Sequence, residues 1–119
     1  MEIGVAAALT QGGFYFLTGI WPIISIGTFQ KITGPKYDLW LVKTVGGLIA
    51  VIGASLLFSG YRGEILPSTI LLAVGSAVVL TGVDVIYVSK RIIASIYLVD
   101  AVVELLLIAW WLFVIATFW

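Results

Sequence analysis

The sequence predicts an all-α polytopic membrane protein whose single domain, residues 1–119, is an up-down bundle of four transmembrane helices. Hydrophobic residues make up 62% of the chain and charged residues only 10%, whereas soluble domains carry about 25% charged residues. The mean hydropathy is +1.22, too apolar for a soluble domain of this size to cover its surface with polar groups. Four apolar segments also alternate with short polar breaks, and each reaches the roughly 20 residues that a membrane-crossing helix needs.

The four expected spans cover about residues 4–29, 39–59, 67–88 and 94–119. Gly34-Pro35 in the first break is a strong turn signal. Pro67 fits the first turn of the third span, and Pro22 predicts a kink in the first. Barrel strands would alternate with period 2 in segments of about ten residues, and these segments are longer and uniformly apolar. The start, Met1-Glu2-Ile3, lacks the positive region of a signal peptide, so the first apolar stretch is expected to remain as a span.

Loop charges predict the orientation of the bundle. The first and third loops carry four basic residues, Lys31, Lys36, Lys90 and Arg91, whereas the second carries only Arg62. The positive-inside rule then places the first and third loops in the cytoplasm and both termini outside. Aromatic residues are expected at the inner interface (Trp40 and Tyr87) and at the outer interface (Tyr61, Phe118 and Trp119).

Small residues recur at intervals of seven along the first three spans. The series are Gly12 with Gly19, then Gly46, Gly53 and Gly60, then Ser68, Gly75, Gly82 and Ser89. Such a repeat predicts a seam along one helix face that allows close packing, with Gly46, Gly53, Gly75 and Gly82 as its main members. The alternative is that glycine is simply frequent in membrane helices. The fourth span has no glycine, so we expect it to supply bulky packing or a surface that faces lipid or a partner.

Four ionisable residues lie inside the apolar segments: Lys43, Asp84, Asp100 and Glu104. An ionised side chain in hydrocarbon is costly, so such groups usually face the bundle interior and pair there. Segments 40–48 and 97–105 align as a possible internal repeat that puts Lys43 at the depth of Asp100, which predicts a buried ion pair. The alternatives are that Lys43 snorkels to the interface and that Asp84 meets water or the basic third loop.

Asp100 and Glu104 lie one turn apart on one helix face, with Glu104 nearest the bilayer centre. Three carboxyl groups face one ammonium in this buried charge cluster, so we expect Glu104 to be protonated at neutral pH and to donate a hydrogen bond. Its candidate polar neighbours in other spans are Gln11, Thr18, Thr44, Ser55, Ser76 and Thr81. The cluster is either a functional site or a polar clasp that fixes helix register, and the sequence leaves both interpretations open.

The sequence lacks the residues that several kinds of metal site and catalytic site require. The chain has no Cys and no His, which removes the usual ligands of zinc, haem and iron–sulfur centres and the imidazole of acid–base catalysis. We therefore predict no catalytic site, no metal and no cofactor. The net charge is zero and no basic patch exists, so we predict no nucleic-acid partner.

The first half of the chain resembles the DoxX-like group of small bacterial four-helix membrane proteins. The likeness rests on Leu17-Thr18-Gly19-Ile20, on Phe29 with Lys31-Ile32, on a proline-containing loop and on the glycine-rich second span. The resemblance implies a four-helix fold in the bacterial cytoplasmic (inner) membrane and an accessory role. It transfers no functional residue.

Three functions are compatible with the sequence. The first is a non-enzymatic accessory or interaction subunit of a membrane complex, whose partners are membrane lipids and either other membrane subunits or further copies of itself. The second is a small proton-linked transporter or carrier with Glu104, Asp100 and Lys43 along its path, because intramembrane acids mark ion and proton routes. The third, a lipid-active enzyme with Asp100 or Glu104 as general acid or base, ranks last because no nucleophile–base pair is visible.

Overall fold

The computed structural model describes residues 2–118 and is all-helical within them. The helices are α1 (Glu2–Ile24), α2 (Ile26–Thr33), α3 (Leu39–Arg62), α4 (Pro67–Ser89) and α5 (Tyr97–Phe118). All but α2 are long and apolar enough to cross a bilayer. The all-α prediction and the four transmembrane spans are therefore confirmed, and the chain is an integral membrane protein.

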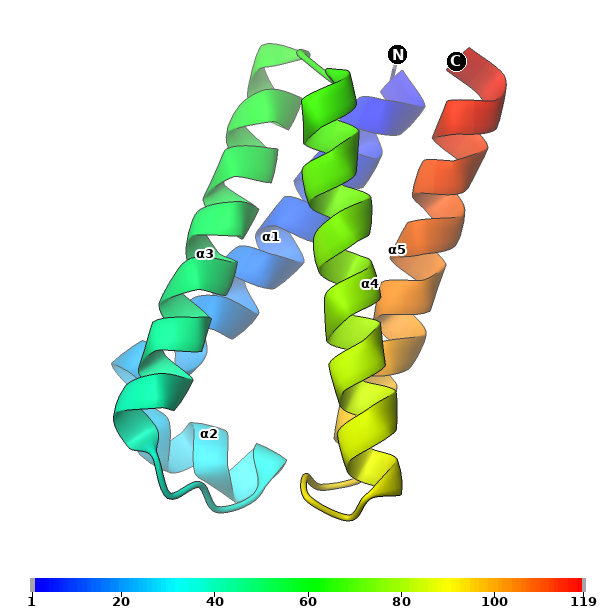
Figure 1. Ribbon diagram of the computed structural model, residues 1–119. Helices are drawn as coiled ribbons and strands as arrows, with labels where there is room; N and C mark the ends of the chain where they lie inside the picture. Colours follow the sequence, from blue (N-terminus) through cyan, green and yellow to red (C-terminus); the bar gives the residue numbers. More distant parts are fainter. Residues whose placement is uncertain (1, 119) are drawn as a thin grey trace.

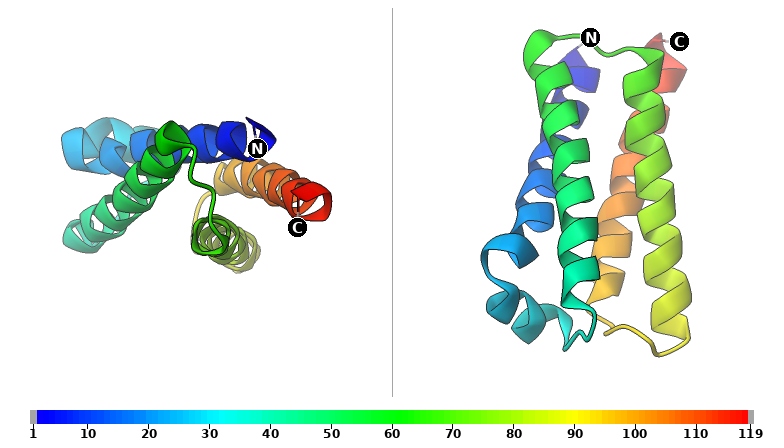
Figure 2. Two further views of the ribbon diagram at one scale, coloured as in Figure 1. Left: turned by 90° about the horizontal axis from the view of Figure 1, so that it is seen from above. Right: turned by 60° about the vertical axis from the view of Figure 1, so that its left-hand side comes forward.

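The four long helices form two pairs, α1 with α3 and α4 with α5 (Figure 1). Both chain ends lie at one end of the bundle, which we call the terminal end, and the loop that joins α3 to α4 lies there too. From this loop the two pairs diverge, and the short α2 lies at the opposite end, which we call the α2 end (Figure 2). The hydrophobic core sits at the terminal end, where the pairs converge; its members are Ala7, Ala8, Leu56, Ile65, Ile70, Ala73, Trp111 and Val114.

The first apolar segment, expected as one span over 4–29, is divided at Ser25. Its backbone leaves the helical region there (φ −144°, ψ 81°), three residues after Pro22, whose ring removes a helix hydrogen bond. Side chains hold the corner: the Trp21 indole donates to the Thr28 hydroxyl at 3.0 Å, and its ring packs edge-on against Phe29. The segment after the corner forms α2 instead of extending α1.

Close packing between α1 and α3 depends on glycines. A Cβ added to Gly19 would lie 2.5 Å from the Gly46 carbonyl oxygen, and one added to Gly53 would lie 2.7 Å from that of Gly12. These backbones approach too closely for any side chain. The seam does not extend to α4, because a Cβ at Gly75 or Gly82 would meet nothing within 4 Å.

Both ends of the loop between α3 and α4 use residues suited to helix ends. Gly63 ends α3 in the left-handed conformation (φ 68°), which glycine adopts without a steric penalty. Pro67 begins α4, as predicted, and the Thr69 hydroxyl accepts a hydrogen bond from the Leu66 N–H. The fourth long helix begins at Tyr97, three residues later than expected. The Trp40 and Tyr61 side chains are exposed, and the Trp119 expectation lies outside the described residues.

Neighbouring glycines in α1 provide a matched test of the seam. Gly12→Ala would put a methyl group 2.7 Å from the Leu57 backbone nitrogen, whereas Gly13→Ala would meet nothing within 4 Å. We expect Gly12→Ala to lower the free energy of unfolding by about 1–3 kcal/mol, as overpacking does, and Gly13→Ala to leave it unchanged. Circular dichroism during denaturation in detergent measures both. Equal effects of the two substitutions would contradict the seam.

Candidate functional site

A fully buried glutamine joins three of the helices. The Gln11 amide on α1 donates to the Ala73 carbonyl oxygen on α4 at 2.9 Å. The Trp111 indole on α5 donates to the Gln11 side-chain oxygen at 2.6 Å. Gln11 and Trp111 have no exposed surface. A buried polar group left unpaired is costly, so these bonds fix how the α1–α3 pair docks on the α4–α5 pair.

One turn further along α1, Tyr15 binds Glu104 on α5. The Tyr15 hydroxyl donates to Glu104 Oε1 at 2.5 Å, and both side chains are buried. Glu104 Oε2 is also buried and has no hydrogen-bond partner in residues 2–118. The structure therefore shows Glu104 as an acceptor, and a proton on Oε2 would find no acceptor within the described chain.

Two further carboxyl groups adjoin Glu104, and we call Asp84, Asp100 and Glu104 the carboxyl cluster. Asp84 on α4 is buried, with Oδ2 unpartnered, and Asp100 on α5 is half-buried. The three carboxyl groups are close enough to interact electrostatically.

Lys43 does not join this cluster. Its side chain is exposed, and the one salt bridge within residues 2–118 joins Arg62 to Glu64 at the surface, 3.2 Å apart. The expectation of a buried cluster that includes Lys43, and of a Lys43–Asp100 ion pair, is therefore wrong for the described chain. α1 covers the neighbouring turn of α3, where Pro22 and Ile23 lie near Gly46 and Gly47, but the Lys43 side chain stays exposed outside that contact. Lys43→Met and Asp100→Leu should accordingly act additively.

Sequence reasoning named Gln11 but missed its partner Trp111, and it missed Tyr15 as the partner of Glu104. Gln11 and Tyr15 lie four residues apart on one face of α1, and Glu104 and Trp111 lie seven apart on one face of α5, which is the signal that could have found them. The other expected neighbours do not reach Glu104. Hydroxyl groups of four of them donate to carbonyls of their own helix, namely Thr18, Thr44, Ser76 and Thr81, and Ser55 is exposed.

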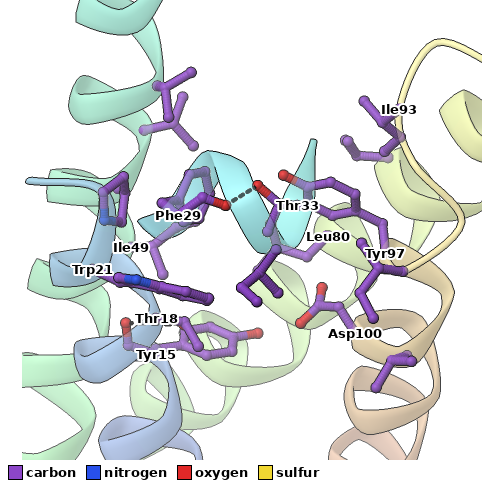
Figure 3. Close-up of a pocket in the computed structure, with 18 of the residues that line it drawn as sticks. Tyr15, Thr18, Trp21, Phe29, Thr33, Ile49, Leu80, Ile93, Tyr97 and Asp100 are labelled. Carbon is purple, nitrogen blue, oxygen red and sulfur yellow. Dashed lines mark hydrogen bonds between the residues drawn. The ribbon is translucent and has the colours of Figure 1, made fainter. Parts of the chain in front are cut away.

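A cavity of about 630 Å³ lies between the two helix pairs on the α2 side of the Tyr15–Glu104 bond. Its walls are largely apolar and include side chains from every helix, and Asp100 and Glu104 line it. In Figure 3 the Tyr15 hydroxyl and the Asp100 carboxyl point into the same space. Five aromatic rings line the cavity: Phe14, Tyr15, Trp21, Phe29 and Tyr97. Its volume is within the range of small-molecule sites, about 300–1,000 Å³.

Lys36 lies at the edge of this cavity nearest α2. Its ammonium donates to the carbonyl oxygens of Thr33 (3.0 Å) and Gly34 (2.9 Å) and to the Thr33 hydroxyl (3.2 Å). It also lies 5.7 Å from the centre of the Phe29 ring and 5.2 Å from that of Tyr97. An ammonium has three N–H donors, so Lys36 has none left for the carboxyl cluster.

Fold and site together define a class: an integral membrane protein with a mostly apolar cavity whose wall includes two carboxyl groups, those of Asp100 and Glu104. No three carboxyl groups within residues 2–118 are placed to ligate one metal ion. The chain matches no family model, no curated protein and no solved structure.

A double-mutant cycle tests the Gln11–Trp111 bond. Gln11→Leu strands the indole N–H, and Trp111→Phe strands the amide oxygen; each should cost at least the 1–3 kcal/mol of an unpaired buried group. The double variant should lose less than the sum, because it strands neither. Unfolding in detergent with a graded denaturant measures all four proteins. Additive losses would show that the two side chains do not interact.

Proposed function

We propose that this protein is a small proton-linked membrane carrier that binds a small molecule in the cavity between its helix pairs. The observation that carries the proposal is Glu104: a fully buried carboxyl group that lines the cavity and keeps one oxygen without a hydrogen-bond partner in residues 2–118. A clasp that only fixed helix register would satisfy both oxygens within the bundle. Acidic groups at membrane depth mark ion and proton routes, and carrier sites lie between helices near the midplane.

In this proposal the carboxyl cluster couples ligand binding to the release of a proton. Tyr15 orients Glu104 through Oε1, which leaves Oε2 free to hold a proton or to face a ligand. Asp100 shares the cavity wall, and Asp84 lies behind it as a second proton site. A proton and the ligand would then compete for the same oxygens. Lys43, which is exposed, has no part in this path.

Loop charges support the orientation that the sequence predicts, with the first and third loops cytoplasmic and both termini outside. The cavity would then open in the cytoplasmic half of a bacterial inner membrane, a location that rests on the DoxX-like resemblance. A membrane-impermeant amine reagent tests the orientation, since Lys90 is exposed and should react only from the cytoplasmic side.

A second candidate is the non-enzymatic accessory or interaction subunit. One observation favours it: the small-residue seam that contains Gly75 and Gly82 is not used inside the chain. A helix of another subunit, or α4 of a second copy, could approach as closely there as α3 approaches α1. A partner that co-purifies in fixed stoichiometry from native membranes would favour this role over a free carrier.

A flux assay with three aromatic compounds of different charge tests the carrier proposal. Liposomes with an acidic lumen and an entrapped pH dye receive, in turn, a cation (tetraphenylphosphonium), an anion (anilinonaphthalene sulfonate) and a neutral molecule (indole). We expect one of them to discharge the pH gradient faster with the protein than without it.

Glu104→Gln, which keeps the shape of the side chain, should reduce this flux to the level of protein-free liposomes. The matched control is Glu64→Gln in the exposed loop, which should leave the flux unchanged. Absence of protein-dependent flux for all three compounds, or full flux in Glu104→Gln, would contradict a proton-linked carrier.

A further inference from the structure

We propose that the cavity takes a lipophilic cation, a largely apolar molecule with aromatic or branched substituents around one positive charge. This inference rests on the proposed carrier function and names its substrate class. Four features support it: the charge balance of the cavity, the position of its aromatic rings, its apolar walls and the unpartnered oxygen of Glu104.

The charge balance favours a cation. Asp100 and Glu104 line the cavity, and the groups that face Glu104 from neighbouring helices are Tyr15 on α1 and Asp84 on α4. None of them is basic. The one basic residue in the cavity lining, Lys36, donates all three N–H groups to Thr33 and Gly34. Within residues 2–118 these acids form no ion pair, and a bound cation would supply the counter-ion.

The aromatic lining fits the same ligand. Rings of Phe29 and Tyr97 already accept the Lys36 ammonium over their faces, which shows that the geometry of this cavity suits cation–π contacts. Tyr15, which binds Glu104, and Trp21 also line the cavity. Cation–π contacts are stronger when the cation is desolvated, as it would be between these rings. An anion would be repelled both by the negative faces of these rings and by the carboxyl oxygens.

The exchange balances in charge and in protons. A neutral Glu104 carboxyl loses its proton to water, and the carboxylate that remains is neutralised by the positive charge of the bound ligand. One proton leaves for each monovalent cation that enters. Because proton and cation compete for one carboxyl group, affinity should rise with pH while the group is mostly protonated, by about tenfold per pH unit.

Two ions of nearly the same size and shape, but opposite charge, test the proposal on the purified protein in detergent. Calorimetry measures the binding of tetraphenylphosphonium and of tetraphenylborate, and a pH dye in weak buffer measures proton release. We expect saturable binding of the cation with release of one proton, tighter binding at higher pH, and no saturable binding of the anion.

Glu104→Gln should weaken cation binding at least tenfold and abolish proton release. Glu64→Gln is the matched control, and circular dichroism verifies that each variant is folded. Anion binding as tight as cation binding, unchanged cation affinity in folded Glu104→Gln, or absence of saturable cation binding would each overturn the ligand class.

The binding and flux assays separate the two proposals. If the anionic or neutral compound shows Glu104-dependent flux and no cation binds, the carrier function is supported and the lipophilic cation is rejected as its ligand. If the cation binds saturably with proton release but no compound shows flux, the cation-binding site is supported and the carrier function is rejected.

Discussion

The fold depends on a clasp of buried hydrogen bonds on two successive turns of α1, which joins two helix pairs that otherwise diverge. The α1–α3 pair coheres through glycine backbones in direct contact, and the α4–α5 pair forms the other half of the bundle. Between the pairs, Gln11 bonds to Ala73 and Trp111, and Tyr15 bonds to Glu104. In hydrocarbon an unpaired polar group is costly, so these bonds fix the position at which the two pairs meet.

Docking at the terminal end leaves the other end open. Side chains fill the space between the pairs where they converge, and a cavity occupies it where they diverge. The Tyr15–Glu104 bond stands at the boundary, which explains how Glu104 can have one oxygen in the clasp and the other without a partner. One residue thereby belongs both to the fixed part of the fold and to the proposed ligand site.

Hydropathy could predict the helical membrane fold and the first three span starts to within a few residues, because the bilayer imposes length and polarity on each segment. It could not predict the corner at Ser25, which depends on tertiary contacts of Trp21 and Phe29. The cost of charge in hydrocarbon predicted the burial of Asp84 and Glu104, but the same argument was wrong for Lys43, whose side chain is exposed. The sequence repeat predicts a seam of small residues, but it does not indicate which helix packs against that seam.

Infrared spectroscopy of the protein in lipid tests the central claim, that Glu104 holds an exchangeable proton at the cavity wall. The difference between wild type and Glu104→Gln should show the carbonyl stretch of a neutral carboxylic acid at neutral pH. That band should weaken, and a carboxylate band should grow, when tetraphenylphosphonium is added. A difference spectrum that contains only carboxylate bands before the cation is added would contradict the account.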